Sequence, residues 1–355
     1  MSLTILSVAY PLAPIGPDAV GGAEQVLSHL DCALVEAGHR SIVVAQEGSQ
    51  TAGTLVAVPR EAGPLGEAAR ERAWEWHRRA IAVALERWPV DLIHLHGIDC
   101  HAYMPPSGVP ALITLHLPPS WYPDAALRPT RSDTWLHCVS QAQHDAYPSS
   151  FNLLPPIPNG VPVAALQARH AKRRYALMLG RICPEKGTHL AIEAAKRADI
   201  ALLIAGEVFP YEAHTRYFAD EVVPRLDRTR RFIGPVGFAR KRRLLTAARC
   251  LLVPSLAPET SSLVAREALA CGTPVVAFPN GALAATVEHG RTGFLVRDVD
   301  EMAKAIEAAG GINVETCRAA ACAQFSLERM IADYFNVYER LAAMGRSRVR
   351  RPGAA

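Results

Sequence analysis

Short apolar runs alternate with amphipathic, helix-like segments along almost the entire chain. Turn-forming residues bound the apolar runs, and the segments between them repeat apolar residues at helical spacing. This alternation indicates parallel β-sheets covered by helices on both faces, which is an α/β fold. The expected strands are residues 3–9, 41–45, 91–95, 111–115, 135–139, 153–154, 176–179, 201–205, 231–233, 250–253, 274–278 and 294–296. The expected helices are residues 23–37, 67–87, 188–197, 213–225, 240–248 and 326–344, with a further helix that carries Glu267.

The alternation breaks at residues 155–162, where four prolines surround an Asn-Gly pair and no helix or strand can continue. We therefore predict two Rossmann-like domains that face each other across a cleft, with ligands at the carboxyl ends of the strands. The first domain is expected to hold residues 1–164 and a last helix, 327–345, that crosses back onto it. The second domain is residues 170–326, and residues 346–355 form a basic, flexible tail.

Composition narrows the class of protein. The net charge of +4 over 355 residues is mild, and no basic stretch is interleaved with aromatic residues, so we expect no nucleic-acid partner. The eight cysteines form no Cys-x-x-Cys pair, which predicts buried free thiols in a reducing compartment. The first residues read as a strand rather than a signal peptide, and no apolar run is long enough to span a bilayer. We expect a cytoplasmic protein whose tail is either a solvated end or a weak electrostatic contact with an anionic membrane.

The segment of residues 258–276 carries the strongest chemical signal. It places Glu259 in a loop before a helix and Glu267 about two turns into that helix, and a Gly-Thr-Pro turn then leads into a strand. The free N–H groups at a helix start suit an anion. Carboxylates bind phosphate poorly but accept hydrogen bonds from sugar hydroxyls. The segment predicts a site for a phosphorylated sugar or a sugar nucleotide.

A second loop, residues 180–187, follows a strand and opens a helix. Arg181 and Lys186 bracket it, and Gly187 permits close approach of backbone to a ligand. An arginine fork and a lysine point charge suit a diphosphate. The spacing is not that of the phosphate-binding loop of nucleotide hydrolases. Together with Glu259 and Glu267 downstream, the loop favours an anion site over a merely charged surface.

The first half of the chain offers two weaker signals. Gly21 and Gly22 lie between the first strand and the first helix, where a Rossmann-like domain exposes its ligand loop, although a flexible helix start fits equally well. His116 ends the strand 111–115 at the carboxyl edge, where we expect the cleft, and a core or capping role is its alternative.

Two patterns that resemble metal sites are interpreted otherwise. His94 and His96 share one side of a strand, but no acidic or cysteine partner lies at a supporting spacing. The pair Asp298 and Asp300 resembles a metal–diphosphate clamp, yet it precedes a helical pattern, and a helix N-cap is the better interpretation. We predict no metal site.

Taken together, these segments resemble the family 4 glycosyltransferases of the GT-B fold, and the likeness covers nearly the whole chain. Each segment alone is weak evidence for the resemblance, but the order and spacing of the segments are specific to the family. The segments are Gly21-Gly22, His116, Ser140, Pro158-Asn159-Gly160-Val161, Gly180-Arg181, Lys186-Gly187, Ala205-Gly206-Glu207, Phe232-Ile233-Gly234, Pro254-Ser255, Glu259, Glu267 and residues 290–296.

The resemblance implies an enzyme that moves a sugar, with retention at the anomeric carbon, from a nucleoside-diphosphate sugar to an acceptor that the sequence does not identify. A UDP- or GDP-sugar is the expected donor, no cofactor or metal is expected, and the reaction follows a front-face course. The implied catalytic residues are His116, Arg181, Lys186 and Glu259. The implied donor-binding residues are Gly21, Gly22, Arg181, Lys186, Val236, Glu259, Ser261, Ser262, Leu263, Val264 and Glu267.

Within these implied roles, Arg181 and Lys186 hold the diphosphate, while the N–H groups of Leu263 and Val264 meet the phosphate. Glu267 takes the ribose hydroxyls and Glu259 a hydroxyl of the donor sugar. Backbone near Val236 reads the edge of the base, and the loop of Gly21 and Gly22 closes on the sugar with His116.

The chain departs from the family pattern after Glu259. The family has a small residue, an aromatic residue and a glycine, whereas this chain has Thr260-Ser261-Ser262, whose hydroxyls are suited to capping the helix and touching phosphate or sugar. Glu207 stands where aspartate is common. Two other functions stay open: a sugar-nucleotide 2-epimerase with the same two-domain plan, and a partner subunit that keeps the fold without turnover.

Overall fold

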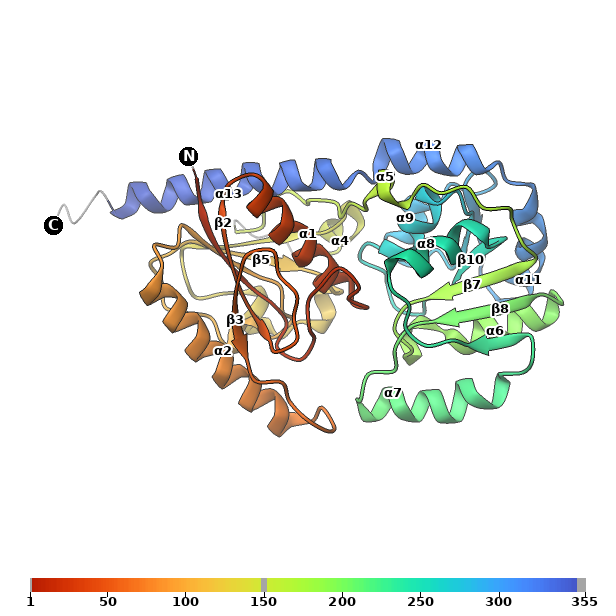
Figure 1. Cartoon of the computed structure of the whole chain (residues 1–355), viewed down its shortest axis with the longest axis horizontal. Helices are drawn as coiled ribbons and strands as arrows, with labels where there is room; N and C mark the ends of the chain where they lie inside the picture. Colours follow the sequence, from red (N-terminus) through yellow and green to blue (C-terminus); the bar gives the residue numbers. More distant parts are fainter. Residues whose placement is uncertain (1, 148–151, 350–355) are drawn as a thin grey trace. The chain divides into compact units, whose positions relative to one another are not determined.

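The computed structural model describes residues 2–147 and 152–349, and the chain divides into two compact units (Figure 1). Unit 1 comprises Met1–Ile157 and Met330–Ala355, and unit 2 comprises Pro158–Arg329. Each unit holds one six-stranded sheet in which every pair of neighbouring strands is parallel. The expected α/β class and the two Rossmann-like domains are confirmed.

The sheet of unit 1 has the strand order β3-β2-β1-β4-β5-β6. Every residue of β1, β4 and β5 is buried, as expected for parallel strands with helices on both faces. The strand order reverses at β1, which pairs with β2 on one side and β4 on the other. The strands are β1 (Thr4–Val8), β2 (Arg40–Gln46), β3 (Thr54–Val58), β4 (Leu92–Leu95), β5 (Ala111–Leu115) and β6 (Thr134–Cys138).

Helices α1 and α2 turn apolar faces inward in unit 1, with Leu27, Leu34 and Ile81 nearly free of solvent contact. Helix α13 begins at the end of unit 2 and continues in unit 1, where it buries Tyr334 and Tyr338 completely. The helices of this part are α1 (Gly22–Glu36), α2 (Glu67–Arg87), α3 (Asp124–Leu127), α4 (Gln141–Asp145) and α13 (Leu327–Val349).

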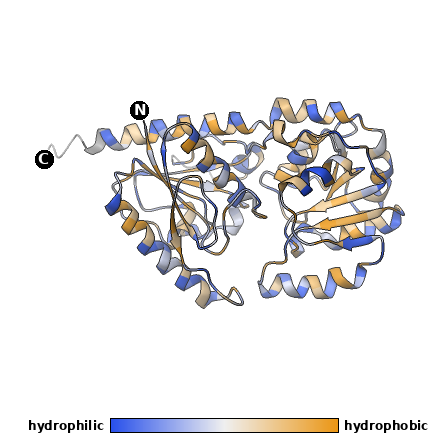
Figure 2. Ribbon diagram, in the orientation of Figure 1, coloured by the Kyte–Doolittle hydropathy of each residue, from blue (hydrophilic) through white to orange (hydrophobic). Residues whose placement is uncertain are grey.

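The sheet of unit 2 has the order β12-β11-β10-β7-β8-β9, and the order reverses between β10 and β7. The hydropathy colouring in Figure 2 marks its central strands as apolar, in agreement with the complete burial of β10 and β11. The strands are β7 (Tyr175–Leu179), β8 (Ala201–Ala205), β9 (Arg230–Phe232), β10 (Cys250–Val253), β11 (Val275–Ala277) and β12 (Gly293–Leu295).

Helices cover both faces of this second sheet. Helix α11 packs against α6, and α12 packs against α9. The Asp298 carboxylate accepts a hydrogen bond of 2.8 Å from the Glu301 N–H and caps α11, which confirms the capping role over a metal clamp. The helices are α5 (Val163–Leu166), α6 (Thr188–Arg197), α7 (Glu212–Tyr217), α8 (Phe238–Ala247), α9 (Leu263–Ala270), α10 (Leu283–Thr286), α11 (Val299–Ala308) and α12 (Val314–Gln324).

Two expected elements differ in the structure, and one strand was not expected. Strand β3 was not predicted, although Leu55–Val58 is an apolar run; it is an edge strand in which only Val58 is buried. Residues 153–154 form no strand, and Leu153 makes only an isolated bridge to Leu136. The predicted helix 213–225 divides into α7, a π-helical turn at Phe218–Val222 and a 3₁₀ turn at Val223–Arg225. Pro224 in that last turn has no N–H to donate to a continuing α-helix.

The boundaries also differ in detail. Residues 158–164 and 327–329, predicted for the first domain, belong to unit 2. The predicted flexible tail starts inside α13, where Arg346 forms an ion pair of 2.8 Å with Asp91, and residues 350–355 lie outside the described residues. All eight cysteines are free thiols, and Cys32 and Cys322 are exposed rather than buried. In the described part of the chain, no helix combines the length and apolarity needed to cross a membrane.

Candidate functional site

The carboxyl ends of β11, β10, β7 and β8 form one continuous stretch of the edge of the second sheet. The loop of residues 180–187 leaves β7, and the loop of residues 254–262 leaves β10 beside it. Gly206 follows β8 with a φ of +156°, and a Cβ at this position would fall 1.8 Å from the Gly180 carbonyl oxygen. The loops after β7 and β8 therefore meet at backbone distance, which requires glycine.

The loop after β7 is held against the loop after β10. The Leu256 N–H donates a hydrogen bond of 2.8 Å to the Glu185 carbonyl. Gly187 adopts a left-handed conformation with a φ of +65°, and a Cβ there would lie 2.2 Å from the Pro254 carbonyl oxygen. Glycine at this position lets the short turn Pro184–Lys186 dock and start α6. This docking aims Lys186 at the neighbouring loop.

Lys186 and Glu259 form a close ion pair. The Lys186 ammonium lies 2.6 Å from Glu259 Oε1, and the Ser255 hydroxyl donates to the same oxygen. Burial raises the pKa of the Glu259 carboxyl, but the Lys186 ammonium, the two hydrogen bonds and the charge of Arg181 outweigh it and leave the pKa below its usual value. Glu259 is therefore an ionised carboxylate in contact with Lys186, and the charge of Arg181 also stabilises its ionised form.

The backbone fixes the position of Glu259 from the other side. The Ala282 N–H donates to the Glu259 carbonyl at 2.7 Å, and the Asn280 side chain donates to the Ser255 carbonyl at 2.6 Å. These bonds tie the loop after β10 to the segment after β11. The site thus lies on loops that leave two adjacent strands, and hydrogen bonds hold these loops in place.

Helix α9 starts from an unusual residue. Ser262 precedes it in the left-handed conformation, with a φ of +53°, and its side chain makes no cap hydrogen bond. The expected capping by this hydroxyl is therefore wrong. Among the described residues, the hydroxyls of Ser261 and Ser262 are buried without a hydrogen-bond partner. Two buried hydroxyls thus lie next to the start of α9, where Leu263 and Val264 supply the first helical N–H groups.

Glu267 is buried within α9, with 4% of its side chain exposed. Its Oε1 lies 2.5 Å from the ammonium of Lys241 on α8, and its Oε2 is buried and has no partner in the described structure. Lys241 was not predicted as a site residue, because it lies within a run of basic residues, 240–243, that looks like a solvated helix face. Half-buried Val236 lies in the segment between β9 and α8, two residues after Gly234, whose carbonyl accepts from the Gly206 N–H at 3.1 Å.

The remaining predicted residues belong to unit 1. Gly21 precedes α1 as its N-cap residue, and Gly22 is the first residue of that helix. His116 directly follows β5, and its backbone N–H donates a hydrogen bond of 2.8 Å to the Tyr122 hydroxyl. His116 Nε2 lies 2.9 Å from His96 Nδ1. Burial, and then the nearby His137, lowers the pKa of His116 to about 3, so its ring is neutral at neutral pH.

His94 has protein partners at both ring nitrogens. Its Nδ1 lies 2.7 Å from the Tyr338 hydroxyl, and its Nε2 lies 2.6 Å from the hydroxyl of Thr114, which also contacts His137 at 2.7 Å. These contacts engage both nitrogens that a metal would need and give His94 a structural role in the core of unit 1.

A different group has metal-compatible spacing. Cys183, Glu185 and His214 place one potential ligand atom each within 4.8 Å of one another. Burial raises the pKa of the Cys183 thiol to about 11, which disfavours the thiolate that a metal would bind.

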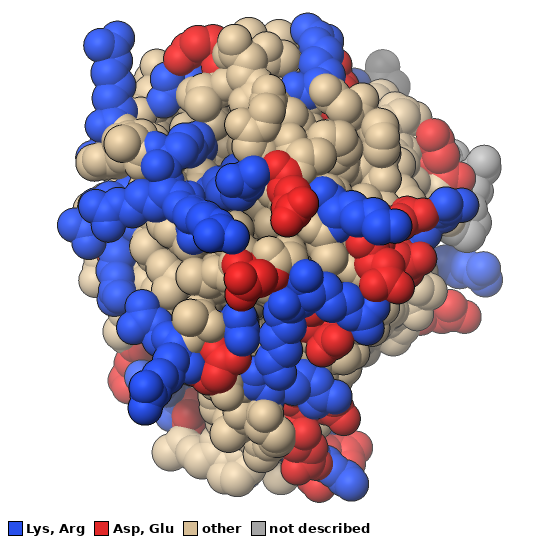
Figure 3. All heavy atoms as spheres, turned by 90° about the vertical axis from the view of Figure 1, so that its right-hand side faces the viewer, with Lys and Arg blue, Asp and Glu red and all other residues tan. Residues whose placement is uncertain are grey.

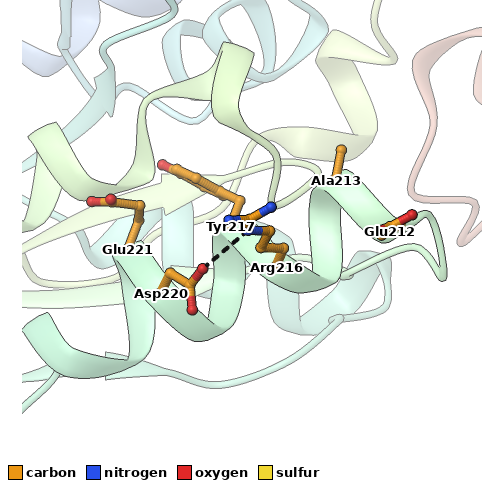
Figure 4. Close-up of a pocket in the computed structure, with 6 residues that line it drawn as sticks. All are labelled: Glu212, Ala213, Arg216, Tyr217, Asp220 and Glu221. Carbon is orange, nitrogen blue, oxygen red and sulfur yellow. Dashed lines mark ion pairs between the residues drawn. The ribbon is translucent and has the colours of Figure 1, made fainter.

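The surface shows two further features. A shallow hollow runs along α7 and the turn after it, with an ion pair of 3.5 Å between Arg216 and Asp220 (Figure 4). Its lining includes none of the predicted site residues. On the face shown in Figure 3, basic side chains are widespread but interspersed with acidic ones.

Comparison with known proteins defines the class. The sequence model described as Glycosyltransferase Family 4 matches residues 20–165, and the model described as Glycosyl transferases group 1 matches residues 173–309. The two matches cover most of both units, and they agree with the two parallel sheets and the site on the second one. The chain belongs to the family 4 glycosyltransferases of the GT-B fold, a family of enzymes.

Individual relatives agree with this assignment. The chain is 32% identical to the D-inositol 3-phosphate glycosyltransferase of Mycobacterium marinum over 200 residues, which are 52% of this chain and 43% of that protein. The match thus spans less than half the length of this curated relative. Sucrose-phosphate synthase from Thermosynechococcus elongatus has a similar fold, with a TM-score of 0.79 at 21% identity over 96% of this chain and 100% of the other. The fold is also similar to that of HepE of Anabaena in complex with UDP and glucose, with a TM-score of 0.74 at 19% identity. This match covers 95% of this chain and 99% of HepE.

Proposed function

We propose that this protein is a retaining glycosyltransferase that uses a nucleoside-diphosphate sugar, with UDP- or GDP-sugars as the expected donors, and that needs no metal ion. The observation that carries the proposal is the arrangement of Lys186, Arg181 and Glu259 beside the start of α9. Cations and helical N–H groups suit a diphosphate, and carboxylates suit sugar hydroxyls.

The ion pair supports a preorganised phosphate site. An ammonium group has three N–H donors, so Lys186 can keep its bond to Glu259 and still donate to a phosphate oxygen. Glu259 and the docked turn hold Lys186 in place before the donor arrives. Departure of a nucleoside diphosphate builds negative charge, which fixed cations stabilise without reorganising.

The serine hydroxyls extend this site. The buried hydroxyls of Ser261 and Ser262 lack partners among the described residues, and a polar group in that state costs free energy unless a ligand satisfies it. Phosphate oxygens or hydroxyls of the donor sugar are suitable partners. We assign both serines to donor binding, where they replace the aromatic residue and glycine of the common family pattern.

The chemistry proposed needs no protein nucleophile. The leaving diphosphate itself takes the proton of the acceptor hydroxyl, and the new bond forms on the face that the diphosphate leaves. Because burial keeps the His116 ring neutral at neutral pH, we assign it no role as a charged acid. HepE of Anabaena, which shares this fold, is described in complex with UDP and glucose, and this supports a nucleotide-sugar donor.

A donor screen tests the proposal. Thermal unfolding is measured with UDP, GDP, ADP and TDP, because a ligand that binds the folded state raises the unfolding temperature. The matching sugar nucleotides are then assayed for release of nucleoside diphosphate, by hydrolysis or transfer. We expect stabilisation by at least one nucleotide and release from its sugar donor. Binding without release from any donor would indicate a non-catalytic partner subunit, and interconversion of the donor sugar would indicate an epimerase.

A further inference from the structure

Lys241 holds one oxygen of Glu267 and leaves the other without a partner. The Lys241 ammonium lies 2.5 Å from Glu267 Oε1, and the side chains of the two residues are only 14% and 4% exposed. Glu267 Oε2 is buried and has no hydrogen-bond partner in the part of the chain that is described. A buried carboxylate oxygen without a donor is unfavourable, so this half of the carboxylate is built to receive a donor from outside the protein.

The position of Lys241 links this pair to the site. Helix α8 starts directly after Val236 and Gly237, the segment that follows β9 at the carboxyl edge of the sheet. The Lys241 ammonium also lies 5.8 Å from the ring centre of Phe238 on the same helix, which limits its freedom. The segment assigned to the nucleotide base therefore leads directly into the helix that fixes Glu267.

We propose that Lys241 is a positioning residue that sets the orientation of Glu267, so that the site selects nucleotides with an intact ribose diol over their deoxy analogues. This inference rests on the proposed function, because it takes Glu267 as the ribose-binding carboxylate. With Oε1 engaged by Lys241, Oε2 is the oxygen left to accept hydrogen bonds from the ribose hydroxyls.

The physical basis of the selectivity is the cost of an unsatisfied acceptor. A nucleotide with both hydroxyls satisfies Oε2, whereas an analogue that lacks the bound hydroxyl leaves a buried carboxylate oxygen without a donor. Sites built around a ligand hydroxyl reject analogues that lack it far more strongly than apolar pockets reject a missing methylene group. We expect at least one of the 2′-deoxy and 3′-deoxy analogues to bind roughly tenfold or more weakly than the parent nucleotide.

The experiment is calorimetric titration of the full chain with the nucleoside diphosphate that binds best, and with its 2′-deoxy and 3′-deoxy forms. In Lys241→Met, Glu267 loses its partner and its fixed orientation. The parent nucleotide should then bind roughly tenfold more weakly, while the weaker deoxy form changes little, so that their affinity ratio falls toward one. Lys241→Arg should restore the ratio. Arg243→Met, an exposed cation on the same helix, serves as the control and should keep the wild-type ratio.

Failure of this inference is distinct from failure of the proposed function. Wild-type protein that binds the parent and both deoxy forms within about twofold would overturn the inference while nucleotide binding stands. A wild-type ratio that survives in Lys241→Met would overturn the role of Lys241. Wild-type protein that binds no nucleoside diphosphate would overturn the proposed function itself. The wild-type comparison decides the selectivity even where a variant does not fold.

Discussion

Lys186 and Glu259, on loops that leave two adjacent strands of the second sheet, lie with ammonium and carboxylate oxygen 2.6 Å apart. The pair is held by backbone contacts on both sides, from Leu256 to Glu185 and from Ala282 to Glu259. A cation that is fixed before the ligand arrives stabilises developing charge at little reorganisation cost. The same pair therefore connects the architecture of the loops to the proposed departure of the diphosphate.

Removal of the Lys186 ammonium should impair transfer. We expect Lys186→Ala to lower the rate by about a hundredfold, because one preorganised charged donor is lost. The circular dichroism spectrum should stay that of the wild type. Lys196→Ala, an exposed lysine on the helix that follows the same loop, is the matched control and should keep full activity. Near wild-type rates in Lys186→Ala would show that the diphosphate is not held there.

Gly187 should tolerate no side chain. In Gly187→Ala, the new Cβ meets the Pro254 carbonyl oxygen, and the left-handed backbone adds about 1 kcal/mol of strain or more. The turn that carries Lys186 must then shift. We expect a lower free energy of unfolding, measured by denaturant titration, and weaker nucleotide binding. Unchanged stability and affinity would contradict the docking of the two loops.

Ser262 should show opposite effects on stability and on binding. Glycine accepts the left-handed conformation freely, so Ser262→Gly relieves backbone strain of about 1 kcal/mol. The entropy that the more flexible glycine loses on folding offsets part of this gain. The unfolding temperature should rise slightly, while nucleotide affinity falls because a buried hydroxyl is lost. If Ser262→Gly binds the nucleotide and its sugar derivative with unchanged affinity, Ser262 is not part of the donor site.

Buried histidines in unit 1 predict a loss of stability in acid. Burial lowers the pKa of His77 to about 4, and that of His137 to about 4. In the unfolded chain these two histidines take up a proton near pH 6.5, whereas in the folded chain they do so only near pH 4. The stabilising contribution is therefore complete above pH 6.5 and is lost as the pH falls from there toward 4. In His77→Leu, the slope of the free energy of unfolding against pH should fall over this window by the amount that corresponds to about one bound proton. An unchanged slope would refute the assignment.

Chelation should leave transfer largely unchanged, because the proposed site neutralises the diphosphate with side chains and helical N–H groups. The measurement is the transfer rate before and after treatment with EDTA and gel filtration. Complete loss of activity that a divalent ion restores would contradict the prediction. It would direct attention to Cys183, Glu185 and His214, whose potential ligand atoms lie within 4.8 Å of one another.

Much of this molecule was predictable because its signals are local. The apolar run Ala111–Leu115 and the helix Glu67–Arg87 match their predicted bounds, since periodicity alone defines them. The edge strand Thr54–Val58 was missed because a single short apolar run is an ambiguous signal on its own. The partnership of Lys241 with Glu267 depends on how α8 packs against α9, and no spacing in the sequence encodes that contact. The left-handed backbone at Ser262 was likewise hidden, because serine is not a residue that signals this conformation.

The most direct test is a crystal structure of the protein with the nucleoside diphosphate that stabilises it best. We predict phosphate oxygens within hydrogen-bonding distance of Lys186 and of the first N–H groups of α9, with the ribose at Glu267. Phosphates bound elsewhere, away from Lys186 and the start of α9, would contradict this prediction.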